Sequence, residues 1–548
     1  MSGSLMNTAM SGLKTAQTAL ATISSNIANA KVEGYHRQTI TLATDGSSTN
    51  NVNGVKVAGI QREYDEFINT NYNKSLTKQS ELKVYADYAL QLDKLMSASD
   101  TDLASSVTEF FSSLQMLSTD AASEPLRNVV VNKSQALVNR FKSVEQQFNA
   151  MERQLNGNIG MIADKVSQLA QQVANLNGEI TKVKGLQGNV PNEILDRRDQ
   201  LARELSAVVG INVVAHGETI NINLTNGLSL VNGNKANKIF AQPSAADPNH
   251  ITLGYDDGMT IRREIDYASV TGGQLAGALA VRDEVLQPNR QKINHLGLVL
   301  AESVNQVQQG GYDLQGNAGQ ALFKTGQPTI VANQQNQGSS DFSAQFTNTT
   351  QVKGIDYAMT FDGNNWQVTE LATKQPVTVT VTPASSTNGT KLTFAGMEIE
   401  VATTSTPQAG DQFIIKPVEG VIDGLSVVMT NPTGIAAAGQ AGTGQADNSN
   451  IKEILALQDK KLIDGRSTYS KAYTSVVSDI AAKANQAKVD VKAQSVITDS
   501  YYQKQQSIAG VNLDEEYLEM TRMQEFYMSN AKVVQVANSL FETLMRIF

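Results

Sequence analysis

The chain ends in residues 513–548, LDEEYLEMTRMQEFYMSNAKVVQVANSLFETLMRIF. Apolar or small side chains recur there at steps of three and four residues, the spacing that lines one face of a helix for packing on another helix. These positions are Met520, Met523, Tyr527, Asn530, Val534, Ala537, Phe541, Leu544 and Phe548. The stretch therefore predicts a long C-terminal helix with a coiled-coil-type stripe.

The chain also opens with a matching stripe. It consists of Met6, Ala9, Leu13, Ala16, Leu20, Ile23 and Ile27. Because both ends carry the spacing of helix-on-helix packing, we expect them to pair as coiled-coil-like terminal helices, residues 1–32 with 512–548. Asn512 is expected to cap the second helix, with Glu515 completing a box-like pattern.

The first thirty residues hold a single charged side chain, Lys14, among many Ser, Thr and Asn residues. A helix of that composition has no face suited to bulk water, and its few large apolar side chains do not offset the entropy of ordering its backbone. We therefore expect it to stay disordered until neighbouring subunits cover it, and the stripes to become buried only against other chains. The candidate subunit-packing residues are Met6, Leu13, Leu20, Ile23, Ile27, Met520, Met523, Tyr527, Val534, Phe541 and Leu544.

The length and composition of the chain exclude several classes of protein and of functional site. A chain of 548 residues is too long for one hydrophobic core. Cysteine is absent, which removes disulfides, thiolate metal sites and cysteine nucleophiles. With a net charge of -9 and no Lys/Arg cluster, the chain is not expected to bind nucleic acid or membranes. No apolar run has the length of a membrane span and no cleaved secretory signal is readable, so cytoplasmic residence and signal-independent export both stay open.

Behind the first stripe, the pattern predicts an extended hairpin and then a helical body. Strands are expected at residues 39–42 and 54–60, followed by helical periodicity over residues 64–209. Gly157 and Gly160 are the expected break in these long helices. The predicted helical body comprises residues 33–210, 279–311 and 433–511.

Two segments with alternating hydrophobicity interrupt the helical body. The first, residues 211–278, contains Asn226-Gly227 as a hairpin turn, and the second comprises residues 312–432. Residues 433–450 are rich in Gly, Ala and Gln and predict a linker. The expected fold is multidomain α+β, with paired terminal helices, a long-helix bundle body and two inserted β-rich domains.

The sequence contains no recognisable catalytic, cofactor-binding or metal-ligating arrangement. Its four histidines are far apart and none has metal-ligand spacing, so each is expected at the surface or in a hydrogen bond. Asp196 and Asp199 lie on one side of a predicted helix, where Arg198 or Arg203 can pair with them. We expect an ion-pair cluster there that joins helices. The protein is expected to be no enzyme and to need no cofactor.

Short segments beside both stripes resemble known signatures. Residues 25–30 (SNIANA) and 34–38 (GYHRQ) resemble the N-terminal signature of bacterial flagellar rod, hook and hook-associated proteins. Residues 510–517 (GVNLDEEY), 530–531 and 537–541 (ANSLF) are similar to their C-terminal signature. The signature residues are Asn26, Asn29, Gly34, Tyr35, Asn512, Leu513, Asp514, Glu515, Asn530, Ala537 and Asn538.

Segments in the interior of the chain resemble one particular family among these flagellar proteins. Residues 195–201 (LDRRDQL), 301–305 (AESVN) and 311–313 (GYD) resemble the hook-associated protein 1 family, the hook-filament junction proteins of the FlgK family. The resemblance implies a structural subunit that is exported unfolded without a cleaved signal peptide and self-assembles as a ring-like zone outside the cell. Its terminal helices would line the channel, surrounded by the helical body and then by the β insertions.

The same resemblance implies the partners. They would be further copies of the chain, the hook protein, a second hook-filament junction protein and an export chaperone on residues 513–548. Three alternatives stay open. The stripes could be core helices of a soluble bundle, or the chain could be a hook or distal rod subunit, although the long helices of residues 64–209 speak against that. A secreted hydrolase with helical export arms would need clustered catalytic groups in residues 211–430.

Overall fold

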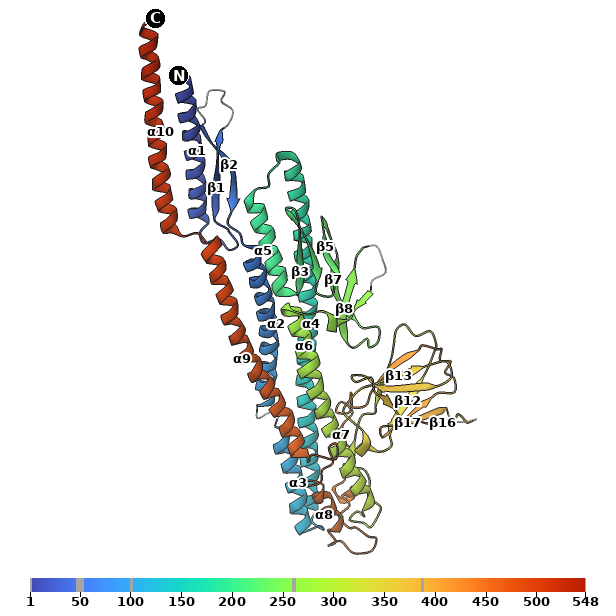
Figure 1. Cartoon of the computed structure of the whole chain (residues 1–548). Helices are drawn as coiled ribbons and strands as arrows, with labels where there is room; N and C mark the ends of the chain where they lie inside the picture. The colour runs from blue at the N-terminus through green and yellow to red at the C-terminus, as the bar shows by residue number, and fades with distance from the viewer. Residues whose placement is uncertain (1, 46–53, 99–101, 259–262, 386–388, 548) are drawn as a thin grey trace.

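The computed structural model describes residues 2–45, 54–98, 102–258, 263–385 and 389–547. Long helices run along an elongated molecule, with both chain ends at one end and the β regions along one side (Figure 1). The helices are α1 (Ser2–Asn29), α2 (Glu66–Met96), α3 (Leu103–Thr119), α4 (Glu124–Gln187), α5 (Asn192–Val208), α6 (Gly273–Val281), α7 (Gln287–Gly310), α8 (Ser449–Ala456), α9 (Tyr469–Ala509) and α10 (Leu513–Ile547).

A two-stranded hairpin connects α1 to the helical body. Strand β1 (Gln38–Asp45) pairs antiparallel with β2 (Gly54–Arg62), which confirms the predicted extended hairpin. Because β2 also packs along α1, the hairpin covers one side of the N-terminal helix.

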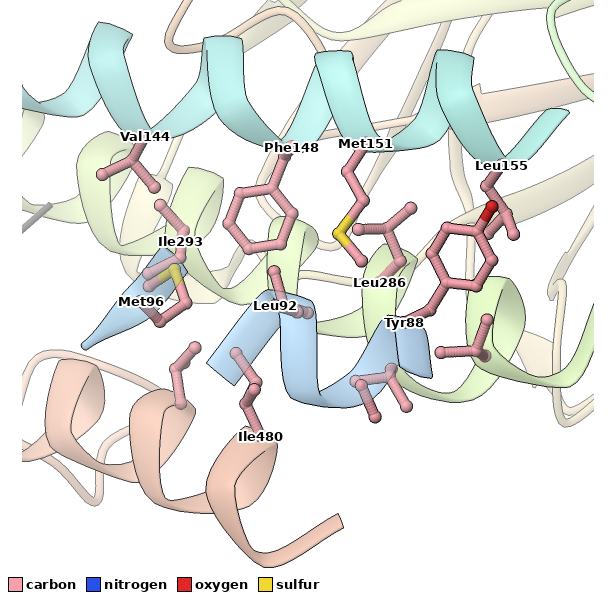
Figure 2. Close-up of a cluster of buried hydrophobic side chains, with 14 of the residues drawn as sticks. Tyr88, Leu92, Met96, Val144, Phe148, Met151, Leu155, Leu286, Ile293 and Ile480 are labelled. Carbon is pink, nitrogen blue, oxygen red and sulfur yellow. The ribbon is translucent and has the colours of Figure 1, made fainter. Parts of the chain in front are cut away.

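The helical body has its core where helices far apart in sequence meet. Figure 2 shows Phe148 and Met151 of α4 pointing toward Leu92 of α2, with Ile293 of α7 and Ile480 of α9 completing the cluster. All five side chains are buried. The long helices predicted for residues 64–209 are confirmed as α2 to α5, since each turns an apolar stripe into this core.

The predicted break at Gly157 and Gly160 was wrong. Helix α4 is continuous through both glycines. Leu155 and Ile159, which flank Gly157, are fully buried, whereas a Cβ on Gly157 would meet nothing within 4 Å. Each glycine costs only about 1 kcal/mol in a helix, so burial of the stripe on the opposite face outweighs it.

The first β region forms two small antiparallel sheets on α4. One contains β3 (Ile211–His216), β4 (Thr219–Leu224), β5 (Ser229–Asn232) and β6 (Lys235–Ala236), and the other β7 (Lys238–Pro243), β8 (Ile251–Asp256) and β9 (Arg263–Ile265). The predicted turn at Asn226-Gly227 is confirmed, with φ of 88° at Gly227. Helix returns at Gly273, earlier than expected, and a π-helical turn (Arg282–Leu286) joins α6 to α7.

The second β region lies beside α7 and projects away from the helical body (Figure 1). One sheet has the order β11-β19-β13-β14-β15, another the order β12-β18-β17-β16, and β10 pairs with β20. The strands are β10 (Phe323–Lys324), β11 (Thr329–Ala332), β12 (Phe342–Phe346), β13 (Tyr357–Phe361), β14 (Trp366–Glu370), β15 (Pro376–Val377), β16 (Thr380–Thr382), β17 (Thr390–Phe394), β18 (Met397–Val401), β19 (Gln412–Lys416) and β20 (Ser426–Val427).

The prediction of a linker over residues 433–450 was wrong. Ile435 and Ala436 are buried, and Arg127 donates a hydrogen bond of 2.6 Å to the carbonyl of Ile435. The backbone N–H of Tyr312 donates to the carbonyl of Ala438 at 2.8 Å. The Gly, Ala and Gln composition suggested flexibility, but the small apolar residues 435–438 are buried against the body and hydrogen-bonded to it, whereas residues 441–446 are exposed.

The multidomain α+β fold is confirmed. The division into four parts stays a prediction, to which the packing adds one observation. Strands of residues 211–265 share a continuous apolar core with the helical body, whereas the second β region has a largely separate core. No described helix combines the length and apolar character needed to cross a membrane.

Candidate assembly site

The two chain ends pair within one molecule. Helices α1 and α10 run antiparallel side by side, and α10 extends past the start of α1 (Figure 1). The approach is close, since a Cβ on Gly12 would lie 2.4 Å from Oδ1 of Asn530. A Cβ at this position would displace the Asn530 side chain, so the signature residue Asn530 packs directly against Gly12. Ala537 is buried in the same pair, whereas Asn538 is exposed.

The predicted stripe residues face the contact between α1 and α10, called the seam below, but their side chains are exposed to different extents. Ile23 is buried, whereas Met6 is 38% exposed and Phe541 55% exposed. The side chain of Leu544 lies outside the described residues. The half-buried members are Leu13, Leu20, Ile27, Met520, Met523, Tyr527 and Val534.

The prediction that the stripes become buried only against other chains was wrong for Ile23, because α10 and the hairpin of the same molecule cover it. For the half-buried and exposed members it stays a prediction. The prediction that α1 is disordered before assembly stays a prediction.

The uncharged polar face of α1 packs on the backbone of β2. The N–H of Val55 donates to Oγ of Ser11 at 3.2 Å, and Oγ1 of Thr15 donates to the carbonyl of Val55 at 3.2 Å. Short hydroxyl side chains reach a strand edge that charged ones could not approach without desolvation. This face is thus built for a strand of the same chain.

Asn26 joins the two helices and the hairpin at the base of the pair. Its Nδ2 donates to the carbonyl of Gln38 at 2.9 Å and to Oε2 of Glu516 at 3.0 Å. Its Oδ1 accepts from the N–H of Gln38 at 3.0 Å and from the hydroxyl of Tyr35 at 2.8 Å. Asn26 is 1% exposed, so its three bonds to Gln38 and Glu516 are shielded from water, whereas the bond from Tyr35 is partly buried. Burial raises the pKa of the Tyr35 phenol, which keeps that hydroxyl a donor.

Glu516 is the residue of α10 that completes this network, and sequence reasoning missed it. It is 2% exposed, and its Oε1 accepts from Nε of Arg37 at 2.7 Å. Arg37 also reaches Glu515 at 3.2 Å. The sequence signal was present, because Glu516 lies inside the C-terminal signature of residues 510–517.

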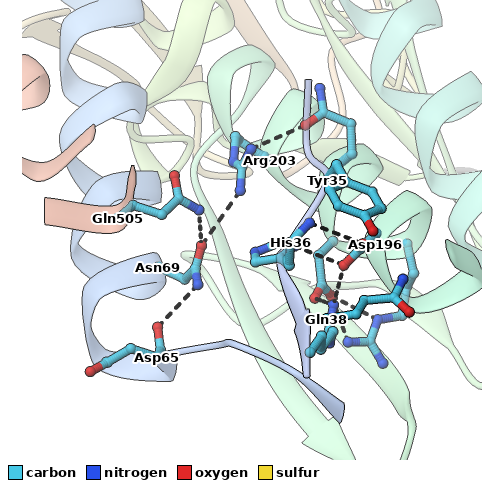
Figure 3. A network of polar contacts seen from close by, with 12 residues as sticks. Tyr35, His36, Gln38, Asp65, Asn69, Asp196, Arg203 and Gln505 are labelled. Carbon is cyan, nitrogen blue, oxygen red and sulfur yellow. Dashed lines mark hydrogen bonds and ion pairs between the residues drawn. The ribbon is translucent and has the colours of Figure 1, made fainter. Parts of the chain in front are cut away.

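A second polar network fastens the segment after α1 to the body (Figure 3). Asp196 of α5 accepts from the N–H of His36 at 3.2 Å, contacts its Nδ1 at 2.7 Å, and pairs with Arg62 at 3.0 Å. Asp199 pairs with Arg62 at 2.7 Å and with Arg198. Burial lowers the pKa of Arg62, but the two carboxylates raise it more, so its pKa lies above the ordinary value.

An ion-pair cluster is present as expected, but the expectation that it joins helices was wrong, because Arg62 lies on β2 and the cluster joins α5 to the hairpin. His36 is a hydrogen-bonded histidine, as expected. The structure corrects one member: Arg203 does not pair with either aspartate, and its guanidinium donates instead to amide oxygens of Gln200 and Asn69.

The remaining signature residues have local roles. Gly34 adopts φ of 83° at the exit of the turn after α1, a conformation that L side chains rarely adopt. Asn29 donates to the carbonyl of Ser25 in its own helix at 2.9 Å. Asn512 caps α10 as expected, because its Oδ1 accepts from the N–H of Asp514 at 3.0 Å. Leu513, Asp514 and Glu515 are exposed.

Helix α10 also carries an exposed apolar ridge that sequence reasoning missed. The ridge lies beside the face toward α1, and its residues are between 38% and 61% exposed. It comprises Leu518, Phe526, Val533, Val536 and Leu540. Its steps of eight, seven, three and four residues are visible in the sequence and place these side chains on one face of the helix.

A cavity of about 670 Å³ lies between the helical body and both β regions. Lys416 pairs there with Asp247 at 2.7 Å and with Glu419. Asp356 accepts from Gln291 at 3.0 Å, and burial raises the pKa of its carboxyl to about 6. The charged groups bridge the two β regions and the body. Within the described part of the chain, no group of three or more acidic or histidine side chains could hold a metal ion.

Family models match three parts of the chain. Residues 89–323 match the flagellar hook-associated protein FlgK helical domain, and residues 331–417 match the D2-like domain of flagellar hook-associated protein 1. Residues 6–36, which contain α1, match the flagella basal body rod protein family. The matched segments include helices α3 to α7 of the body, most of the second β region and α1 of the assembly site.

Individual proteins give the same result over the full length. The chain is 39% identical to flagellar hook-associated protein 1 of Escherichia coli (strain K12), over 99% of this chain and 100% of that protein. It is 37% identical to that of Salmonella typhimurium, with the same coverage. The fold is similar to a solved structure, the flagellar hook junction protein FlgK from Burkholderia pseudomallei, with a TM-score of 0.73, 24% identity, and 80% of this chain and 100% of that one covered. The chain therefore belongs to the flagellar hook-associated protein 1 family, the structural proteins of the junction between flagellar hook and filament.

Proposed function

We propose that this chain builds the hook-filament junction by self-assembly, and that the exposed apolar surfaces of α1 and α10 pack against further copies. The observation that carries the proposal is the ridge of α10 defined above. On a helix already paired with α1, it leaves five large apolar side chains facing water. A row of this kind on an extended arm is typical of a surface that another protein covers.

The N-terminal end of α1 continues this surface. Leu5, Met6 and Met10 are 44%, 38% and 51% exposed. The start of α1 lies at the same end of the molecule as the end of α10 (Figure 1), where Phe541 and Met545 are 55% and 65% exposed. Since the pair has little interior of its own, neighbouring copies would bury the rest. In this arrangement the terminal helices line the channel, the helical body surrounds them and the β regions face outward.

The other partners are proposed on the same grounds. The hook protein and a second junction protein would contact the two ends of the ring. An export chaperone would cover the apolar ridge within residues 513–548 before export. The chain would leave the cell unfolded, without a cleaved signal peptide, as an extracellular part of the flagellum. A structural role without catalysis agrees with the family.

The test uses the full-length chain in flagellated cells that lack their own copy. Leu540→Glu and Phe541→Glu place charges on side chains that are 52% and 55% exposed. Burying either charge without a partner would cost several kcal/mol, so filament growth and motility are expected to be lost. The matched control is Val381→Glu, which changes a 51% exposed residue on β16 in the second β region.

Both sets of variants should fold and be exported in similar amounts, as measured by circular dichroism and in the culture medium. If the two α10 variants restore filaments as well as Val381→Glu does, self-assembly through α10 is refuted.

A further inference from the structure

Methionine is the only sulfur-containing residue of this chain, and it is concentrated at the two ends. The sequence has 15 methionines and no cysteine. Seven of the 15 lie in residues 1–29 and 513–548, which together hold only 65 of the 548 residues. Methionine favours helix, and its unbranched thioether adapts to irregular contacts, so it suits helices that repack against several neighbours. The seven are Met1, Met6, Met10, Met520, Met523, Met528 and Met545.

The fold shields some of the methionines and exposes others. Met96, Met151 and Met359, in the helical body and the second β region, are at most 4% exposed. Four of the exposed methionines lie on α1 and α10, and two lie on α3 and α4 of the body. An oxidant in the surrounding medium reaches exposed thioethers first. The exposed ones among the described residues are Met6, Met10, Met528 and Met545 at the chain ends, and Met116 and Met161 on the body.

Met6 and Met10 belong to the surface that the proposed function buries between copies. They stand four residues apart, so they are neighbours on one side of α1. Met6 is 38% exposed and Met10 is 51% exposed, whereas Ala9 between them is 1% exposed. This stretch of α1 is therefore held in place by its own molecule, while its two thioethers stay open to water. Their oxidation state decides whether this surface presents apolar or polar groups to a neighbour.

We propose that Met6 and Met10 are oxidation sites, and that their conversion to methionine sulfoxide by a peroxide prevents the chain from joining a junction. The thioether sulfur attacks one oxygen of hydrogen peroxide, the S–O bond forms and the O–O bond breaks. The sulfur loses two electrons to the peroxide, and the second oxygen leaves as water with both protons. The inference rests on the proposed function, because it requires that neighbouring copies bury this surface.

The sulfoxide is expected to weaken association without unfolding the free chain. It keeps the length of the side chain but adds a strong hydrogen-bond acceptor, which water can solvate while Met6 and Met10 are exposed. Between two copies this oxygen would lose its water, and burial of a polar group without a hydrogen bond is unfavourable. The side chains next to it on α1, Leu5, Ala9 and Leu13, are apolar and offer no donor.

A partly oxidised sample of the full-length chain gives the sharpest test. The purified chain is treated with hydrogen peroxide, catalase removes the excess, and the chain is mixed with hooks isolated from cells that lack their own copy. Mass spectrometry then measures the sulfoxide at each methionine in the bound and the unbound chains. Sulfoxide at Met6 and Met10 is expected to be about tenfold or more rarer in the bound chains.

Met116 and Met161 are matched controls within the same molecule, because they are 45% and 67% exposed on the body. Their sulfoxides should be equally frequent in bound and unbound chains. Circular dichroism of the oxidised chain should match that of the untreated chain. Treatment with methionine sulfoxide reductase should restore binding, since this oxidation step is reversible. A sulfoxide at Met6 and Met10 that is as frequent in bound as in unbound chains would overturn the proposal.

Variants test the same idea in cells without an oxidant. Met6→Gln with Met10→Gln replaces both thioethers by polar groups of similar length, and Met116→Gln with Met161→Gln is the control. Each double variant is expressed together with the wild-type chain, and both are quantified in purified hook-filament junctions. The first should be under-represented about tenfold or more, and the second should match the wild type. Equal incorporation of the two double variants would refute the proposal. If the first does not fold, the oxidised wild-type chain still decides.

Two further comparisons separate this inference from the proposed function. Peroxide added to assembled junctions should oxidise Met116 and Met161 but spare Met6 and Met10, and equal oxidation of all four would contradict the inference. If Leu540→Glu is excluded from junctions while chains with oxidised Met6 and Met10 bind normally, the oxidation inference fails and the proposed function stands. If Leu540→Glu assembles normally, the proposed function fails first.

Discussion

Replacing Asn26 with alanine tests how the two chain ends are held together. The change removes four hydrogen bonds at a position that is 1% exposed. Both backbone groups of Gln38 lose a partner, and Glu516 keeps only Arg37. A buried polar group that loses its partner costs about 1 to 3 kcal/mol. Because Tyr35 is half-buried and can recruit water, we expect a loss of about 3 to 5 kcal/mol in the local stability of the joint.

The matched control is Asn29→Ala, one helical turn further along α1. Asn29 donates mainly to the carbonyl of Ser25, four residues earlier in the same helix, and makes no side-chain bond to the described residues of α10 or the hairpin. Its loss should cost at most about 1 kcal/mol. Asn26→Asp is informative as well, because it keeps two acceptor oxygens but sets a second carboxylate against Glu516, at a position where Asn26 now donates over 3.0 Å. The repulsion between the two carboxylates should open the joint at neutral pH, and protonation in acid should remove this repulsion and let the joint close.

Hydrogen exchange of the full-length monomer, read by mass spectrometry on peptides covering residues 22–45 and 511–520, measures the effect. Exchange at these peptides should speed up by about 100- to 4,000-fold in Asn26→Ala, since each factor of ten corresponds to about 1.4 kcal/mol. Peptides from the core of α4 should be unchanged in every variant. Equal exchange in Asn26→Ala and Asn29→Ala would refute the idea that Asn26 locks the joint.

Three further changes test other parts of the account. Gly12→Ala should stabilise the helix of an isolated α1 peptide by about 1 kcal/mol, which circular dichroism measures. The same change should weaken junction assembly, measured as filament growth, because the new Cβ would lie 2.4 Å from Oδ1 of Asn530. Burial raises the pKa of Asp356 to about 6, above its unfolded value near ~3.9, so ionisation penalises the fold and stability falls as pH rises through this window. Asp356→Asn should therefore stabilise the protein by up to about 3 kcal/mol near pH 7.5 but not near pH 4, as read from melting temperatures at both pH values; a gain at the lower pH would contradict the assignment. Gly157→Ala should raise the melting temperature by the equivalent of about 0.5 to 1 kcal/mol, because α4 is continuous and the new methyl group meets nothing within 4 Å; a lower value would indicate a break there.

Much of the fold could be predicted from hydrophobic periodicity, because the apolar stripes of α1, α4 and α10 are local in sequence. Phe148 and Met151 stand where their spacing predicts, in the core of the body. The incorrect predictions inferred flexibility from local composition at places where tertiary packing keeps the chain ordered. Gly157 and the segment around Ile435 both suggested flexibility, and in both cases burial of neighbouring apolar side chains decides the structure.

The assembly site was predictable only in part. The seam residue Ile23 followed from its spacing, but the partners that lock the joint are distant in sequence. Asn26 and Glu516 are 490 residues apart, and His36 and Asp196 are 160 apart. No local pattern links such pairs. The exposed ridge of α10 was visible in its spacing, yet only the structure separates it from the face that α1 covers.

The central claim is that the terminal helices are incomplete surfaces that further copies cover. Hydrogen exchange at residues 5–15 and 530–545, compared between the full-length monomer and assembled junctions, tests it most directly. The account predicts fast exchange in the monomer, apart from the joint around Asn26 and Glu516, and strong protection after assembly. Amides of these helix ends that are as well protected in the monomer as in the junction would contradict it.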